Sequence, residues 1–299
     1  MKTKAKIRDG LRPSGSVMTL YLLPGLLIYL LIFIFPSVMS LLLSLFKFTS
    51  IKSFQFIGLA NYKTLIADSN VLLALKNNLF LVGVCLIGQI GLALTLAGLL
   101  NSSMARLSNV YRTLIFFPVT LSAVVIGYVW KMVYDYNYGI IAFLLKAFGH
   151  GDMVNPWLSQ ADTVMTAVSI PMIWQYVGFH LVILLSAMTS IDKSVYEMAE
   201  VDGANGFQRM FKITLPLIRG TIMLCVFLCI SANMKAFDHI LAMTNGGPGF
   251  SSSVLALYAY KVSFSQMNMG YGSAVSVFVL VVTMCLFLIS RLVMSIRKD

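Results

Sequence analysis

The sequence predicts an all-α polytopic membrane protein with six transmembrane helices. Of its 299 residues, 59% are apolar and only 11% are charged, whereas soluble domains have roughly 45–50% apolar and about 25% charged residues. Five stretches that lack Asp, Glu, Lys and Arg approach or exceed the ~20 residues that a spanning helix needs. None of them alternates like a barrel strand, and only a helix then pairs all of its backbone groups within lipid.

The predicted spans cover residues 18–46, 74–100, 110–133, 163–189, 217–241 and 269–293. The first apolar run is too long for a signal peptide and has no small-residue cleavage site, so it is predicted to remain as a helix. Kinks are expected at Pro24, Pro36 and Pro171, because proline lacks a backbone donor. The fifth span carries Lys235 and Asp238 at or near its outer end.

A single transmembrane domain, residues 18–293, accounts for the chain, with short tails at 1–17 and 294–299. Most of the 22 basic residues fall on one side of the predicted spans, and these are Lys2, Lys4, Lys6, Arg8, Arg12, Arg106, Arg112, Lys193, Arg209, Lys212, Arg219, Arg291, Arg297 and Lys298. The positive-inside rule then places both termini in the cytoplasm. The net charge of +11 is thereby explained by topology, and no nucleic-acid partner is expected.

The loops on the opposite side differ in character. The mixed aromatic and polar segment Phe54 to Asn70 suits a short interfacial helix. The segment from Tyr134 to Asp162 carries aromatic residues typical of the membrane interface. The glycine-rich segment Thr244 to Ser253 is expected to be a flexible turn.

The chain lacks the motifs of nucleotide and hydrolytic chemistry. No Gly-Lys dipeptide occurs, so the phosphate-binding G-x-x-x-x-G-K-[ST] loop is absent, as are H-E-x-x-H, G-x-S-x-G and C-x-x-C. Cys225 and Cys229 share a helix face but have no nearby His or carboxylate, which favours apolar packing over a metal site. We therefore expect no enzymatic activity, no metal and no cofactor bound by this chain.

The loop of residues 189–220 is the most polar insert between two spans. Ser190 or Asp192 is placed to cap a short helix that runs through Glu200. Gly203 supplies a sharp turn, and a second short helix is predicted from Phe207 to Lys212. Pro216 then marks the entry to the fifth span. We expect a helix-turn-helix that projects into the cytoplasm.

The same loop resembles a known family. The spacing E-x-A-x-x-x-G-x9-I-x-L-P is met by Glu197, Ala199, Gly203, Ile213, Leu215 and Pro216 and resembles the EAA loop of binding-protein-dependent ABC importer permeases. The sequence TNGGP at Thr244 to Pro248 and the dipeptide Pro24-Gly25 resemble the carbohydrate branch, especially the maltose permease F component. The resemblance covers nearly the full chain, and Met198 departs from it where the motif has its middle alanine.

The resemblance implies a type I importer permease in a bacterial or archaeal cell membrane. The expected partners are a second homologous permease, two cytoplasmic ATP-binding subunits that carry ATP and Mg, and an extracytoplasmic solute-binding protein. The carried solute would be a carbohydrate. The residues assigned to ATPase coupling are Glu197, Ala199, Asp202, Gly203, Ile213, Leu215 and Pro216.

A sugar needs hydrogen-bonding side chains and aromatic faces along a hydrated cavity. The fourth span offers Trp174, Tyr176 and His180, although ordinary packing also explains these residues. The fifth span offers a second set, which consists of Ser231, Asn233, Lys235 and Asp238. Lys235 and Asp238 are three residues apart and could pair on one helix face, or they could mark the outer boundary of the span.

Two further function classes stay open at this point. An ion-driven secondary carrier would act without partners, but the interior stretches of five of the six predicted spans hold no Asp, Glu, Lys or Arg, which such carriers usually hold within their helices. A membrane scaffold or receptor without a transport role is the other, and no segment of the chain resembles a signalling module.

Overall fold

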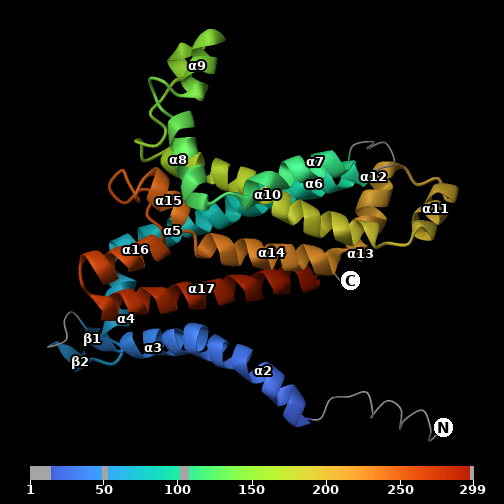
Figure 1. Cartoon of the computed structure of the whole chain (residues 1–299). Helices are drawn as coiled ribbons and strands as arrows, with labels where there is room; N and C mark the ends of the chain where they lie inside the picture. Colours follow the sequence, from blue (N-terminus) through green and yellow to red (C-terminus); the bar gives the residue numbers. More distant parts are fainter. Residues whose placement is uncertain (1–14, 49–52, 102–107, 297–299) are drawn as a thin grey trace, which may run out of the picture.

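The computed structural model of the chain describes residues 15–48, 53–101 and 108–296 and is largely helical (Figure 1). By length and composition, four of its helices can each cross a membrane: Ser16–Leu43, Ser69–Leu100, Val164–Thr189 and Met269–Val293. Two bent helix pairs raise the number to six if each pair is one span. The predicted six-span fold is confirmed on that count. Lys2 to Arg12, Arg106, Arg297 and Lys298 lie outside the described residues.

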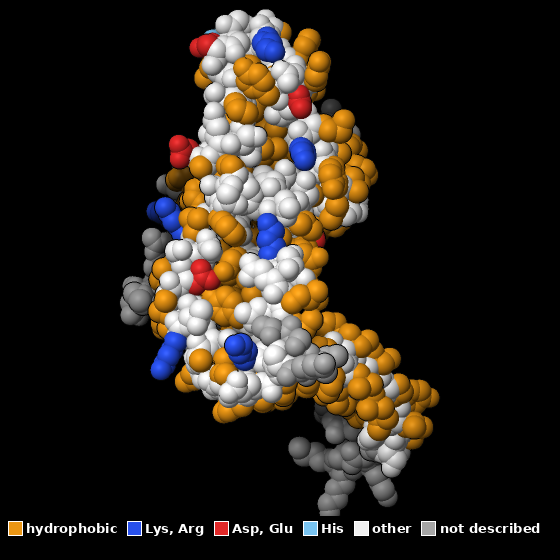
Figure 2. Space-filling view, turned by 90° about the vertical axis from the view of Figure 1, so that its left-hand side faces the viewer, with side chains coloured by type: hydrophobic (Ala, Val, Ile, Leu, Met, Phe, Trp, Pro, Cys, Tyr) orange, Lys and Arg blue, Asp and Glu red, His pale blue; other side chains and the backbone are white. Residues whose placement is uncertain are grey.

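The first span is an apolar arm at the edge of the bundle: its α3 part packs against α17, and its α2 part extends away (Figure 1). It consists of α2 (Gly15–Tyr29), the π-helical turn η1 (Leu30–Ile34) and α3 (Phe35–Leu43). None of the residues in its most apolar stretch is buried, and Figure 2 shows hydrophobic side chains covering the arm. Pro24 and Pro36 do not interrupt the helix. Lipid or other chains must therefore cover this surface, because so large an apolar face is not stable in water.

A short β-hairpin, which the sequence did not predict, follows the first span. Strands β1 (Phe46–Phe48) and β2 (Phe54–Phe56) pair antiparallel, with Phe46 opposite Phe56. Cross-strand phenylalanine pairs are the unit that stabilises such a ribbon, and the rings of Phe46 and Phe54 stack at 4.4 Å. The helix α4 (Ala60–Ala67) comes next and confirms the predicted short helix, whose place at the membrane interface stays a prediction.

The centre of the bundle is α10 (Val164–Thr189), which packs against the second span and against α7 (Ser108–Phe116). In its most apolar stretch 61% of the residues are buried. The second span consists of α5 (Ser69–Cys85), η2 (Leu86–Gly91) and α6 (Leu92–Leu100). Gly178 allows the close approach of α7, because a Cβ at this position would overlap with the backbone of Ile115. Pro171 lies inside α10 without ending it.

The third span is sharply bent, which corrects the prediction of one continuous helix over 110–133. The segment Ser108–Thr120 meets Ala123–Val133 at 98°. Pro118 lies in the 3-10 turn η3 (Phe117–Thr120) before the bend, and Leu121 is extended with ψ 147°. The bend frees the carbonyl of Leu121, and the buried side chain of Gln175 in α10 donates to it at 2.9 Å. The helices of this region after η3 are α8 (Ala123–Val133), α9 (Ile140–Ala147) and η4 (Gly151–Met153).

The fifth span ends earlier than predicted. The helix α14 (Arg219–Met234) stops before Lys235, and Asp238 begins a separate helix, α15 (Asp238–Met243). The predicted pairing of Lys235 and Asp238 on one helix face is therefore wrong, and the described residues show no ion pair between them. The chain continues through α16 (Leu255–Tyr260) and η6 (Lys261–Ser265) to the last span, α17 (Met269–Ile296).

The glycine-rich segment before α16 is tied down by hydrogen bonds, although the sequence predicted a flexible turn. Asn77 in α5 donates to the backbone oxygens of Ser251 and Ser253 at 2.9 and 2.8 Å. Within the segment the hydroxyls of Thr244 and Ser252 lie 2.7 Å apart. These bonds hold the segment on the bundle.

Candidate coupling loop and solute cavity

The first helix of the polar loop, α11 (Lys193–Val201), begins as the sequence predicts. Asp192 is its N-cap, and one of its carboxylate oxygens accepts a hydrogen bond from the backbone amide of Ser194 at 2.9 Å. Hydrogen bonds from the backbone and side chain of Ser194 hold the pKa of Asp192 below its ordinary value. An N-cap of this kind satisfies a backbone donor that the helix leaves unpaired.

The end of α11 explains the spacing of the motif from Ala199 to Gly203. The backbone amide of Ala204 donates to the carbonyl of Ala199 at 2.9 Å, and that of Gly203 donates to Glu200 at 3.0 Å. This pair of bonds is a Schellman closure, in which the residue after the C-cap takes the left-handed conformation. Gly203 has φ +77°, which L side chains rarely adopt. The sharp turn of the loop therefore lies at Gly203.

The second helix of the loop begins as α12 (Gly206–Arg209), one residue before the predicted Phe207, and its helical segment continues to Leu217, beyond the predicted end at Lys212. It begins with a reciprocal capping box between Asn205 and Gln208, with both bonds at 2.9 Å. The π-helical turn η5 (Met210–Thr214) and the short α13 (Leu215–Leu217) then lead to α14 across a 72° bend. The bend follows Pro216, so this predicted entry residue lies just before α14.

Side-chain contacts join the two halves of the loop. The hydroxyls of Tyr196 and Thr214 lie 3.1 Å apart, and Arg209 forms an ion pair and a hydrogen bond with Glu200. A cavity of about 520 Å³ separates the loop from the ends of α6 and α10, and Glu197 lines it. The two halves of the loop are therefore connected to each other, and Met210 packs against Gly98 of α6.

The surface of the loop is polar with an apolar component. Ala199 is buried at 6% exposure, whereas Glu197 and Asp202 are exposed. Ile213 and Leu215 are half-buried and Pro216 is exposed. Four large apolar side chains of the loop also face outward, and these are Met198, Val201, Phe207 and Phe211. Exposed apolar side chains among charges are typical of a protein-protein contact surface.

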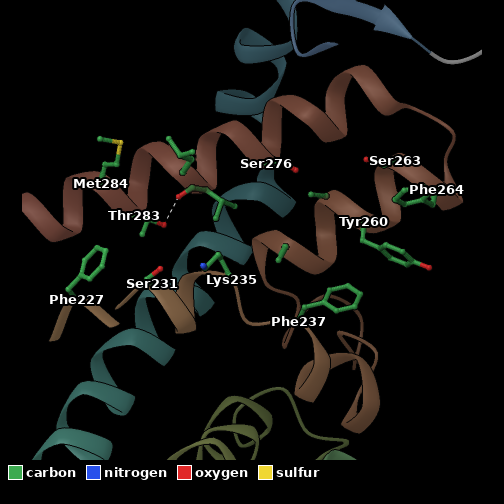
Figure 3. A pocket seen from close by; sticks show the side chains of 14 residues that line it. Phe227, Ser231, Lys235, Phe237, Tyr260, Ser263, Phe264, Ser276, Thr283 and Met284 are labelled. Atoms are coloured by element: carbon green, nitrogen blue, oxygen red, sulfur yellow. Dashed lines mark hydrogen bonds between the residues drawn. The ribbon is translucent and has the colours of Figure 1, made fainter. Parts of the chain in front are cut away.

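A cavity of about 700 Å³ lies at the other end of α14. In Figure 3 its serine and threonine hydroxyls come from three elements: Ser231 from α14, Ser263 from η6, and Ser276 and Thr283 from α17. Aromatic side chains from α14, the following break, α16 and η6 form the rest of the wall, namely Phe227, Phe237, Tyr260 and Phe264. Hydroxyls and aromatic rings together suit a polar solute with apolar ring faces.

Two predicted path residues, Ser231 and Lys235, line this cavity. Lys235 is the C-cap of α14 and is exposed. Asn233 and Asp238 do not line it. The amide of Asn233 donates to the carbonyl of Cys229 at 2.8 Å in its own helix, and the exposed Asp238 starts α15.

The predicted residues of the fourth span lie elsewhere. Trp174 is 44% exposed and its ring contacts that of Trp130 at 6.0 Å. The ring of Tyr176 lies 6.1 Å from that of His239. His180 is 3% exposed, and its Nδ1 has no hydrogen-bond partner within the described part of the chain.

Sequence reasoning missed the contribution of the last span to the cavity. Ser276 and Thr283 are seven residues apart, which places both on one helix face. That spacing of hydroxyls in an otherwise apolar span was a readable signal. Tyr260 and Phe264 carried no comparable signal, because their segment was not predicted to be helical.

Comparison with known proteins shows the family of the chain. Residues 89–296 match the family model of binding-protein-dependent transport system inner membrane components. The probable ABC transporter permease protein YurN of Bacillus subtilis (strain 168) is 33% identical over 282 residues, which cover 94% of this chain and 96% of the relative. The multiple sugar-binding transport system permease protein MsmF of Streptococcus mutans is 28% identical and covers 88% of this chain and 89% of its own length.

The same fold occurs in a solved bacterial ABC transporter that imports the acidic polysaccharide alginate. One of its chains matches with a TM-score of 0.82 and 21% identity, and the match covers 100% of both chains. The structural likeness shows the ABC importer permease fold, and the sequence matches extend over almost the entire chain. This protein therefore belongs to the family of binding-protein-dependent transport system inner membrane components, the membrane-embedded permeases of ABC transporters.

Proposed function

We propose that this permease imports a carbohydrate and that α14 is the element that couples ATP hydrolysis to the solute pathway. One observation carries the proposal: α14 begins at the polar loop and ends at the 700 Å³ cavity. Its 16 residues span roughly 24 Å at ~1.5 Å per residue. A displacement of the loop is therefore transmitted to Ser231 and Lys235 through a single helix.

The loop is built to receive a displacement. Its first helix, α11, is capped at Asp192 and closed at Gly203, and the two halves of the loop are joined by the contact between Tyr196 and Thr214. A segment connected in this way moves as a unit when a partner presses on its exposed face. We propose that an ATP-binding subunit docks there, with Glu197, Ala199, Asp202, Gly203, Ile213, Leu215 and Pro216 as the coupling residues.

The lining of the cavity supports a carbohydrate as the solute. Ser231, Ser276 and Thr283 place hydroxyls in the lining, and aromatic rings form apolar walls beside them. The hydroxyls of Ser276 and Thr283 donate to backbone oxygens of their own helix, so they offer a solute their acceptor lone pairs. The similarity to a sugar permease and to an alginate importer supports the same class. The other predicted path residues are proposed to act outside this cavity, along the route to it: Trp174, Tyr176, His180, Asn233 and Asp238.

The remaining subunits follow from the family. We propose that a second homologous permease completes the pathway, that a binding protein delivers the solute from outside, and that two cytoplasmic subunits bind ATP and Mg. This chain then needs no cofactor and catalyses no reaction itself. The basic residues on the loop side support cytoplasmic termini.

Uptake into vesicles tests the proposal. The chain is reconstituted together with the partner permease, the ATPase and the binding protein that neighbouring genes encode. Labelled di- and trisaccharides are then supplied with ATP. We expect saturable uptake that requires ATP and every subunit. The alternative, an ion-coupled secondary carrier, predicts gradient-driven uptake by this chain alone, and that result would overturn the proposal.

A further inference from the structure

A third cavity, of about 560 Å³, lies between α8, α10 and the segment that joins them. Its volume falls within the roughly 300–1,000 Å³ of small-molecule sites. Thr163 and Thr166 line it at the beginning of α10, whereas the coupling loop follows the end of that helix. The 26 residues of α10 separate the two by roughly 39 Å. The cavity shares no lining residue with the 700 Å³ cavity.

Three aromatic rings form one side of this 560 Å³ cavity. The rings of Trp130 and Tyr134 are 5.5 Å apart and inclined by 42°, and those of Tyr134 and Trp157 are 6.0 Å apart and inclined by 55°. The hydroxyl of Thr163 donates to the backbone oxygen of Trp157 at 2.8 Å, which ties the backbone at Trp157 to the beginning of α10. Inclined aromatic rings present broad apolar faces to a ligand.

The hydroxyl of Tyr134 is the strongest sign of a ligand. Tyr134 is 6% exposed, and within the described residues its buried oxygen has no hydrogen-bond partner. A buried polar group without a partner costs about 1–3 kcal/mol, so natural structures rarely keep one without a reason. A ligand that carries donors and acceptors would satisfy this hydroxyl.

The rest of the lining narrows the class of ligand. Asp162 and Thr166 add a carboxylate and a hydroxyl on an exposed edge, and neither Lys nor Arg lines the cavity. An anionic lipid headgroup therefore finds no counter-charge. A trimethylammonium group or an acyl chain fits among aromatic rings but offers no hydrogen bond to Tyr134. A sugar ring combines apolar faces with hydroxyls and meets both requirements.

We propose that this aromatic cavity is a carbohydrate-binding subsite, separate from the 700 Å³ cavity and at the end of the molecule opposite the coupling loop. Trp130 and Trp157 pack against the apolar faces of a sugar ring, and Tyr134 and Asp162 bond to its hydroxyls. The inference rests on the proposed function for the class of solute. It adds a place where the solute is held outside the central pathway.

The three tryptophans of the chain make the site directly observable. Trp130 and Trp157 line the cavity, and Trp174 contacts Trp130. The full-length chain in phosphatidylglycerol nanodiscs is titrated with maltotriose, raffinose and diacetylchitobiose, and with choline as a comparator. We expect a saturable change in tryptophan emission and weaker quenching by acrylamide with at least one saccharide and none with choline.

Conservative variants link the signal to the site. Tyr134→Phe keeps the ring and should weaken saccharide binding about two- to tenfold, the equivalent of one hydrogen bond of ~0.5–1.5 kcal/mol. Tyr128→Phe is the matched control, because Tyr128 is an exposed tyrosine of α8 that does not line the cavity. Trp157→Leu removes one wall, leaves Trp130 as the reporter and should also weaken binding.

Specific outcomes would overturn the inference. One is the absence of a saturable change in tryptophan emission with any of the saccharides. Another is equal saccharide affinity in Tyr134→Phe and the unmodified chain. The third is a change in emission on adding choline or exchanging the lipid, with none on adding saccharide. ATP-driven uptake by the assembled importer without such binding would remove the subsite and leave the proposed function intact. Binding that persists where uptake fails would support the subsite and count against the importer.

Discussion

The side-chain amide of Asn78 donates a hydrogen bond to the backbone oxygen of Asn233, 3.0 Å away at the last turn of α14. The same amide reaches the carbonyl of Met234 at 3.3 Å, and its oxygen accepts from the backbone amide of Leu255 at 2.8 Å. One fully buried side chain of the second span thus holds the end of the fifth helix and the beginning of α16. The break before Lys235 is stable because Asn78 supplies the partners that a continuous helix would supply.

Replacing this side chain should therefore destabilise the bundle. Asn78→Ala leaves buried carbonyls and a buried amide without partners, each at a cost of about 1–3 kcal/mol. We expect the Tm of the purified chain in detergent to fall by several degrees. Asn137→Ala, at an exposed position, should change the Tm little, and equal Tm values for the two variants would contradict this role of Asn78.

The turn at Gly203 should matter for coupling through its backbone. A Cβ at this position meets no neighbouring atom within 4 Å, so the cost of a side chain comes from the φ of +77°. Gly203→Val should reduce ATP-driven uptake at least tenfold with normal membrane insertion. Asn tolerates the left-handed region better than other residues, so Gly203→Asn should retain most of the uptake. Equal uptake by the two variants would show that the turn is unimportant.

Substitutions in the 700 Å³ cavity should change the affinity for the solute more than the turnover rate. Ser231→Ala and Lys235→Gln each remove polar groups that line it. Loss of one hydrogen bond corresponds to about a two- to tenfold change, so we expect KM for uptake to rise by that factor. Lys131→Gln, at an exposed position of α8, is the control. An unchanged KM in both cavity variants would place the solute elsewhere.

Asp68 should make the stability of the outer loops depend on pH. Burial alone would raise the pKa of its carboxyl, but hydrogen bonds from Tyr258 and Tyr271, at 2.6 and 2.7 Å, and from backbone amides hold it below the ordinary 3.8. A lowered pKa in the folded state stabilises the fold above the unfolded value, and this contribution is lost as the pH falls through the folded value.

The matching experiment follows the Tm of the chain and of Asp68→Asn from pH 7 down to pH 3. The variant should be less stable at pH 7, and the difference should stay constant down to about pH 4 and shrink below it. Asp152→Asn, at an exposed position, should follow the unmodified chain. A difference that grows on acidification would contradict the sign.

The positions of the spanning helices could be predicted from the sequence, but their breaks could be predicted only in part. Long apolar stretches specify where a helix lies, because lipid requires every backbone group to be paired within it. The bends depend on partners that are distant in sequence. The carbonyl freed at Leu121 is paired by Gln175, and the end of α14 is paired by Asn78. No local sequence pattern indicates a hydrogen-bond partner that is distant in sequence, so the third and fifth spans were predicted as continuous helices.

The coupling loop shows the opposite case. Its caps use side chains and amides within five residues of each other, as at Asp192 with Ser194 and Ala199 with Ala204. Local bonds of this kind follow from residue type and spacing. The helix-turn-helix and its Gly203 turn were therefore predictable, and the start of the second helix was misplaced by one residue.

The sequence by itself determined the membrane class, the number of spans and the polar loop, because hydrophobicity and short-range hydrogen bonds are written into consecutive residues. The tertiary structure decided which polar side chains share a cavity. Ser231 and Lys235 meet Ser276 and Thr283 across two helices, while Trp174 lies with Trp130 in a different region. Those neighbours are set by how the helices pack and where they break, and both depend on contacts between residues far apart in the chain.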